Sequence, residues 1–242
     1  MTYCVGLLLD QGIVLLSDTR TNAGLDNISI YRKMFTFSND GERVIAIMTA
    51  GSLSVTQTTL ARLTEATEED DPDETRSILH APSMLKVAQI IGATLADVTT
   101  DVSIKLSRMN QSATASLIVA GQRRGGPMRM FLIYPEGNFI EATRDTPFLQ
   151  IGEHKYGKPI LDRVITPETS LEDAEKAVLL SMDSTLRSNL SVGMPLDLVV
   201  IEKDSFRISR QRRIEAEDER FAQLSRAWSD ALRDAYQKIE SL

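Results

Sequence analysis

Two short apolar runs on either side of a tight turn constrain the start of this chain most strongly. Tyr3–Leu9 and Ile13–Ser17 are both of strand length, and Asp10-Gln11-Gly12 between them is typical of a hairpin turn. In such a hairpin, residues whose numbers sum to about 22 face one another. Asp18, at the end of the second run, is therefore expected to lie near Thr2.

The remaining elements are grouped by type. Strand-like runs follow at Met34–Phe37, Val44–Met48, Thr114–Ala120, Met128–Tyr134, Asn138–Ala142, Leu196–Ile201 and Phe206–Ser209. Helical spacing of apolar residues covers Ser52–Glu65, Ser83–Leu106, Gly157–Val164, Leu171–Arg187 and Glu215–Leu242. Two polar segments, Thr19–Ser29 and Glu68–Glu74, predict loops. This grouping indicates an α+β fold, in which two antiparallel sheets, each covered by a helical pair, make a four-layer αββα sandwich.

The chain shows neither a repeat nor a low-complexity linker over its 242 residues. We therefore expect a single domain over residues 1–242, with 215–242 as a C-terminal helix. The apolar stripe of that helix, which includes Trp228, is consistent both with packing on its own domain and with a subunit contact.

Charge and cysteine content exclude several classes of protein. Lys and Arg number 27 against 34 Asp and Glu, a net charge of −7, so the basic surplus of a nucleic-acid binder is missing. Cys4 is the only cysteine, which favours a reducing compartment. No apolar run approaches the ~20 residues that a membrane span needs, and no basic residue precedes the first apolar run. We expect a cytoplasmic protein without nucleic-acid or membrane partners.

Few residues are available for metal or phosphate chemistry. The two histidines, His80 and His154, cannot form a multi-histidine zinc site, and we interpret both as structural or exposed. Gly121–Pro127 is glycine-rich but opens no helix, so a hairpin is favoured over a phosphate cradle. We expect no metal and no cofactor.

The N-terminus carries the most informative chemistry. Thr2 follows Met1 and is small enough that removal of Met1 is expected. The trimmed chain would begin with a hydroxyl and a free α-amine on one residue. With a reference pKa of about 8, that amine is partly unprotonated near neutral pH and can act as the base for the hydroxyl.

Three further residues are predicted to meet Thr2. Lys33 begins the third strand after a loop long enough to return it to the edge where Asp18 lies. A lysine there lowers the pKa of the Thr2 hydroxyl, and Asp18 would hold it in place. Gly51 ends the fourth strand just before a helix, where a backbone N–H can face a developing oxyanion.

These residues carry a family resemblance. Thr2, Ser17-Asp18-Thr19-Arg20, Lys33 and Met48-Thr49-Ala50-Gly51-Ser52 together resemble a proteasome β-type subunit, which is an N-terminal nucleophile (Ntn) hydrolase. The resemblance extends to about residue 210 through Leu132–Gly137, Ile151-Gly152-Glu153, Arg187–Gly193 and Asp197–Ile201. Within that superfamily, residues 151–163 and the Thr directly after Met are most similar to the bacterial proteasome homologues called Anbu.

The resemblance implies a role for each matched residue. Thr2 would be nucleophile and base, Lys33 would tune its hydroxyl with the help of Asp18, and the Gly51 N–H would form the oxyanion hole. Ser191 matches a serine that supports the N-terminal amine. Further candidates are Ser188 and Arg20 as supporting residues, and Thr21, Tyr31, Thr49 and Leu53 for the substrate pocket. The αββα fold and self-assembly into a ring or open spiral are also implied.

Two positions depart from the family pattern. Ser188 stands where an active β-subunit has Asp, and a serine cannot supply a negative charge. Glu153 stands where the family commonly has Ser, which places a carboxylate near the site. Both changes bear on general peptide-cleaving power more than on the fold.

Three functions stay open. The first, which we favour, is a homo-oligomeric threonine peptidase or amidohydrolase that cleaves a peptide or amide through an acyl-enzyme ester. The second is an acylase or amide-forming transferase that uses Thr2 on a non-protein substrate. The third is a non-catalytic scaffold subunit, against which stands the joint presence of Thr2, Asp18, Lys33 and Gly51.

Overall fold

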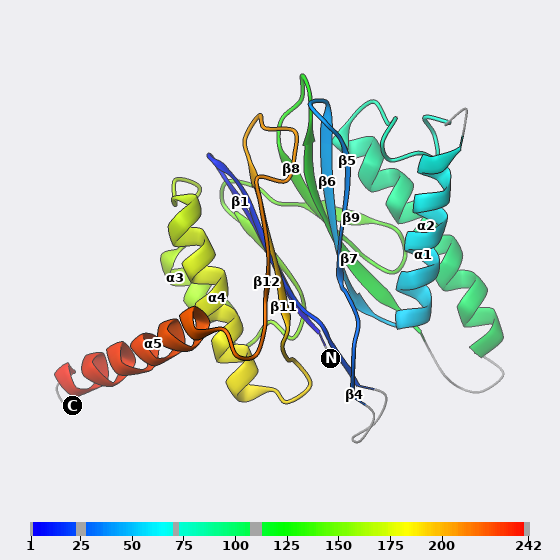
Figure 1. Ribbon diagram of the computed structural model, residues 1–242. Helices are drawn as coiled ribbons and strands as arrows, with labels where there is room; N and C mark the ends of the chain where they lie inside the picture. Colours follow the sequence, from blue (N-terminus) through cyan, green and yellow to red (C-terminus); the bar gives the residue numbers. More distant parts are fainter. Residues whose placement is uncertain (1, 23–27, 70–72, 107–112, 240–242) are drawn as a thin grey trace.

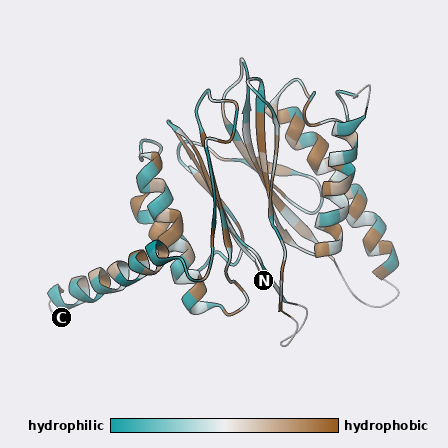
Figure 2. Ribbon diagram, in the orientation of Figure 1, coloured by the Kyte–Doolittle hydropathy of each residue, from teal (hydrophilic) through white to brown (hydrophobic). Residues whose placement is uncertain are grey.

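The chain folds into four layers in a computed structural model that describes residues 2–22, 28–69, 73–106 and 113–239 (Figure 1). Two five-stranded antiparallel sheets lie face to face between two layers of helices. Apolar residues gather on the strands and on the helix faces that cover them (Figure 2). The predicted α+β sandwich is confirmed for the described residues.

The first sheet contains the N-terminal hairpin. Its order is β10 (Phe148–Gly152), β1 (Tyr3–Leu9), β2 (Gly12–Asp18), β11 (Leu196–Glu202) and β12 (Arg210–Ile214). Side chains alternate along β1, so that Tyr3 packs toward the helices α3 (Lys158–Val164) and α4 (Leu171–Ser188), and Cys4 packs toward the other sheet. The side chain of Ser170 caps α4 by accepting a hydrogen bond from the Asp173 backbone N–H.

The second sheet has the order β5 (Met34–Asn39), β6 (Arg43–Gly51), β7 (Ala115–Arg123), β8 (Arg129–Ile133) and β9 (Phe139–Glu141). The helices α1 (Leu53–Glu68) and α2 (Met84–Leu106) cover its outer face. Their stripes, represented by Leu63 and Ile91, pack on Ile45 and Phe131 of the sheet. This core fixes the end of β6, where Gly51 lies.

The C-terminal helix α5 (Glu219–Lys238) extends away from the four layers (Figure 1). Asp218 caps it, so the helix begins four residues later than predicted. Phe221 packs against the core beside α4, whereas Leu232 and Tyr236 are exposed. Only the first part of α5 therefore packs on its own domain.

Several predictions of individual elements were wrong. The strand expected at 206–209 begins later in the chain, as β12. The preceding turn, in which Asp204 and Phe206 adopt positive φ, extends into the expected range. The loop expected at 19–29 contains two short strands, β3 (Arg20–Asn22) and β4 (Ile28–Ile30). Strand β10 was not predicted. Parts of the expected loops and of the C-terminal helix (23–27, 70–72 and 240–242) lie outside the described residues.

Candidate active site

The N-terminal hairpin brings Asp18 to the first residues of the chain. Cys4 faces Ser17 across the hairpin, so the register sum is one less than predicted. Asp18 therefore lies opposite Tyr3, and its Oδ1 accepts a hydrogen bond of 3.1 Å from the Tyr3 N–H. Met1 lies outside the described residues.

Lys33 and Asp18 form a buried ion pair, as predicted. Lys33 Nζ lies 2.7 Å from Asp18 Oδ1 and also donates to the Arg20 carbonyl at 2.6 Å. Asp18 Oδ2 accepts from the backbone N–H groups of Arg20 and Gly193. Burial, the largest influence, raises the pKa of the Asp18 carboxyl, while Lys33 acts in the opposite direction. The ammonium group is therefore held at a defined position by two oxygen atoms, Asp18 Oδ1 and the Arg20 carbonyl oxygen.

Strand β10 fixes the backbone of Thr2 from its other side. The Glu153 N–H donates to the Thr2 carbonyl at 2.7 Å. Gly152 has φ +82°, and a Cβ on it would lie 1.9 Å from the Thr2 carbonyl oxygen. Only glycine therefore allows β10 to approach Thr2 so closely.

Replacing Gly152 by alanine is expected to displace Thr2 and to lower the unfolding free energy by about 2 kcal/mol, because the new methyl group meets backbone that cannot yield. Gly125→Ala is the matched control, since Gly125 also has positive φ but nothing lies within 4 Å of its Cβ position. Urea denaturation of both variants checks the prediction. Equal losses would show that Gly152 matters only for its backbone conformation.

Gly51, the predicted oxyanion-hole residue, lies at the end of β6 and lines the same pocket as Thr2. The Thr49 N–H donates to the Lys33 carbonyl on the β5 side of β6. Because residues two apart on a strand direct their N–H groups to the same side, the Gly51 N–H points past the start of β5. Gly51 has φ +114°, and a Cβ there would clash with the Thr114 carbonyl at 2.3 Å. The turn into α1 thus leaves this N–H facing the site.

A pocket of about 330 Å³ joins these groups. Its walls include Thr2, Lys33, Gly51 and Gly152. Of the four predicted substrate-binding residues, Thr21, Thr49 and Leu53 line this pocket. Tyr31 does not line it, and its side chain is exposed.

The predicted supporting residues differ in their relation to the pocket. Arg20 packs on Gly193 and donates to the Leu190 carbonyl, so it braces the loop after α4. Ser191 is half-buried and its carbonyl accepts from Asn22, a pocket residue. Ser188 is exposed at the end of α4. The role of Ser191 at the N-terminal amine and the supporting role of Ser188 both stay predictions.

Two features of the site, a contact of Glu153 and the position of Arg32, were not predicted from the sequence. The Glu153 carboxylate accepts a hydrogen bond from Asn189 at 3.1 Å and so ties β10 to the loop after α4. Arg32 lines the pocket next to Lys33. In the sequence, the position of Arg32 directly before the predicted catalytic lysine could have indicated that it lies at the site.

Tyr3, which follows Thr2 and begins β1, anchors this strand to α4. Its hydroxyl, buried between β1 and α4, is bonded to Ser181 Oγ at 2.6 Å and accepts from Gln150 Nε2 at 2.7 Å. Burial raises its pKa to about 12 from 10.0. The buried hydroxyl group is therefore neutral at all physiological pH values.

Because this pKa is higher in the folded chain than in the unfolded chain, the resulting stabilisation is complete below pH 10 and is lost as the pH rises toward 12. A shift of this size corresponds to roughly 3 kcal/mol. Urea denaturation of the wild type and Tyr3→Phe between pH 8 and 11.5 measures this loss. The variant is expected to show a smaller alkaline loss, and an equal loss in both would contradict the assignment.

Within the described ranges, no three His, Cys, Asp or Glu side chains gather closely enough to hold a metal ion. Among the described helices, none combines the length and apolar character that a membrane-spanning segment requires. Cys4 is buried with its Sγ 3.7 Å from the Thr49 carbonyl, and burial raises its thiol pKa.

The fold and this arrangement define a class of protein, and comparison with known proteins agrees. The family model described as proteasome subunit matches residues 2–201, and the chain belongs to that family. Membership supports a threonine-type Ntn hydrolase in general. A curated relative, proteasome subunit beta 2 of Pyrobaculum calidifontis, is 26% identical over 204 residues, which are 84% of this chain and 90% of the relative.

Solved structures narrow the class to a proteasome β-like fold of the Anbu type. An Anbu (Gly-1) mutant from Hyphomicrobium sp. strain MC1 is 48% identical, with a TM-score of 0.92 over 100% of this chain and 99% of that one. The helical assembly of the Anbu complex from Pseudomonas aeruginosa is 43% identical, with a TM-score of 0.92 over 99% of this chain and 98% of that one.

Proposed function

We propose that this chain is a proteasome-type threonine peptidase or amidohydrolase whose nucleophile is Thr2 after removal of Met1. One observation carries the proposal: the Lys33 ammonium, fixed by Asp18 and the Arg20 carbonyl, shares a pocket with Thr2 and Gly51. A buried cation beside a hydroxyl favours the alkoxide form and thus nucleophilic attack. Burying two charges costs desolvation free energy, and a non-catalytic scaffold subunit has no functional need for such a pair.

The reaction follows from these positions. The free α-amine of Thr2 takes the proton of its own hydroxyl, and Oγ attacks the substrate carbonyl carbon. The Gly51 N–H stabilises the oxyanion that forms. The protonated amine then gives its proton to the leaving amine as the C–N bond breaks, which leaves an acyl ester on Thr2. Water, deprotonated by the same amine, hydrolyses the ester and restores the hydroxyl.

We further propose that the chain acts as a homo-oligomer in the cytoplasm. The P. aeruginosa Anbu complex forms a helical assembly. The exposed Leu232 and Tyr236 of α5 offer apolar surface for contact with a second copy. Subunits arranged in a ring or open spiral would enclose the pockets and limit access to them.

A paired substrate screen tests the proposed reaction. Unfolded casein and a series of small N-acyl amides are incubated with wild type and with Thr2→Ala, and new amines are counted by fluorescence. Cleavage of peptide bonds that depends on Thr2 supports the peptidase. Thr2-dependent cleavage of small amides alone would favour the acylase or transferase, and no Thr2-dependent cleavage of any kind would contradict the proposal.

A further inference from the structure

The charges that line the Thr2 pocket are unequal in sign. Among its lining residues are two cations, Arg32 and Lys33, and no acidic residue. The charge of Lys33 is offset by Asp18 at 2.7 Å. Arg32 has no ion-pair partner among the described residues, so the pocket carries its positive charge uncompensated. This is unexpected in a chain whose net charge is −7.

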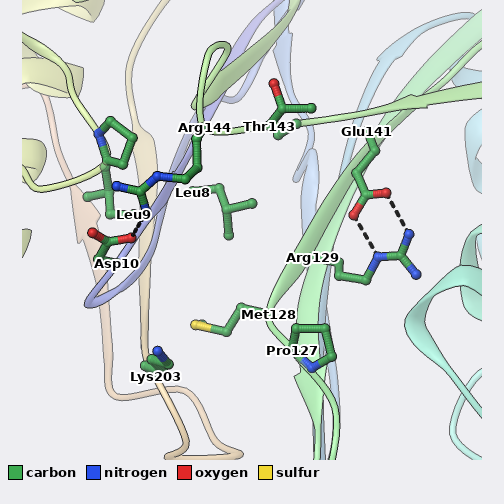
Figure 3. Close-up of a pocket in the computed structure, with 12 residues that line it drawn as sticks. Leu8, Leu9, Asp10, Pro127, Met128, Arg129, Glu141, Thr143, Arg144 and Lys203 are labelled. Atoms are coloured by element: carbon green, nitrogen blue, oxygen red, sulfur yellow. Dashed lines mark hydrogen bonds and ion pairs between the residues drawn. The ribbon is translucent and has the colours of Figure 1, made fainter.

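The pocket at the opposite end of the sandwich provides a contrast (Figure 3). It has a similar volume of about 330 Å³, and its lining includes two arginines. There, Arg129 forms a two-pronged pair with Glu141, and Arg144 bonds to Asp10 and to Glu168. Both arginines of this second pocket therefore have carboxylate partners, whereas Arg32 has none among the described residues. Since no described residue pairs with Arg32, its guanidinium is available to a ligand in the Thr2 pocket.

Resting on the proposed function, we propose that Arg32 selects substrates that carry a carboxylate close to the scissile carbonyl. Guanidinium groups bind carboxylates through charge-assisted, often two-pronged hydrogen bonds. The carboxylate has two chemical sources: an acidic side chain on the residue that donates the carbonyl, or the free C-terminus of the leaving residue. Arg32 is thus a specificity-determining residue, with no part in the bond-breaking steps.

The size of the preference follows from the position of Arg32. A hydrogen bond to a charged group contributes about 1.5–3 kcal/mol when solvent is excluded, and less at an exposed side chain such as Arg32. We expect the carboxylate to raise the acylation rate constant about tenfold over its neutral amide counterpart. Neutral apolar substrates are not excluded, because Leu53 and Ala50 line the same pocket.

Two pairs of probes test the inference. Peptide epoxyketones that differ only in Glu or Gln at the reacting residue report on the donor side, through their rates of adduct formation on Thr2. Peptides whose leaving residue ends in a carboxylate or a carboxamide report on the leaving side, through their cleavage rates. In the wild type, at least one pair is expected to react about tenfold faster with its charged member. In Arg32→Gln this rate ratio should fall to near unity. In Arg32→Glu the preference should reverse, so that a Lys-containing probe reacts faster than the Glu-containing one.

Arg207→Gln is the matched control, because it removes the same charge from an exposed arginine in the β11–β12 turn, at the far end of the sheet from Thr2. This variant is expected to keep the preference. Equal rates within both wild-type pairs, or a preference unchanged in Arg32→Gln, would overturn the inference while adduct formation still upheld the proposed function. If no probe labels Thr2 and no peptide is cleaved, the proposed function itself fails, and the inference falls with it.

Discussion

Thr2→Ala is expected to lower kcat/KM for peptide or amide hydrolysis by ~10³-fold or more, the usual cost of removing a nucleophile. Alanine is as small as threonine for removal of Met1, so the α-amine is kept and only the hydroxyl is lost. The Thr2 backbone bond to Glu153 does not involve the side chain, so folding should be unaffected. Thermal unfolding and fluorogenic peptide turnover, measured on the same preparation, check both expectations.

Thr2→Ser is the matched variant. It keeps the hydroxyl and the amine and loses one methyl group, so it should recover a measurable part of the wild-type turnover. Turnover in Thr2→Ala equal to that of the wild type would assign the activity to another group or to a contaminant. Inactivity of Thr2→Ser together with normal folding would mean that the methyl group is needed to orient the nucleophile.

Asp18→Asn is expected to lower the unfolding free energy by about 3 kcal/mol, because it leaves the buried Lys33 ammonium without its carboxylate. Acylation should fall at least ~10²-fold as Lys33 loses its position or its charge. The control is Asp101→Asn, which removes the partner of Arg62 in an exposed pair and should change stability by less than about 1 kcal/mol. Urea denaturation and epoxyketone labelling measure the two effects.

A double variant separates stability from catalysis at this pair. Removing both charges in Asp18→Asn with Lys33→Met should regain much of the lost stability, since no unpaired charge remains buried. It should not regain activity, because the cation next to Thr2 is gone. Equal stability losses for Asp18→Asn and Asp101→Asn would show that the buried pair contributes little and would weaken the account of the site.

The local signals in the sequence were sufficient for most of the fold and for the central residues of the site. Strand length and turn chemistry predicted the first hairpin, and that hairpin placed Asp18 beside the start of the chain. The long apolar stripes of α1, α2 and α4 predicted the covering helices. Strand β10 was missed because it is short and lies among turns, and only its pairing with β1 gives it a regular conformation.

What could not be predicted depends on contacts between segments far apart in the sequence. The approach of Gly152 to Thr2 joins residues 150 positions apart, and no local pattern reveals which glycine must lack a side chain. Tyr31 and Arg32 are neighbours in sequence, yet only Arg32 lines the pocket, since the start of β5 determines which of them faces inward. Lys33 is buried and paired with Asp18, whereas Arg32 is exposed and has no ion-pair partner among the described residues, a difference that the sequence does not reveal.

Intact-protein mass spectrometry after treatment with a peptide epoxyketone tests the central claim most directly. The probe forms its ring adduct only with a residue that carries both a hydroxyl and a free α-amine, so the reaction reports the N-terminal nucleophile itself. We expect a mass that lacks Met1 and carries one adduct per chain, with no adduct in Thr2→Ala. A chain purified from its own host that retains Met1 and stays unlabelled would contradict the account and favour a non-catalytic scaffold subunit.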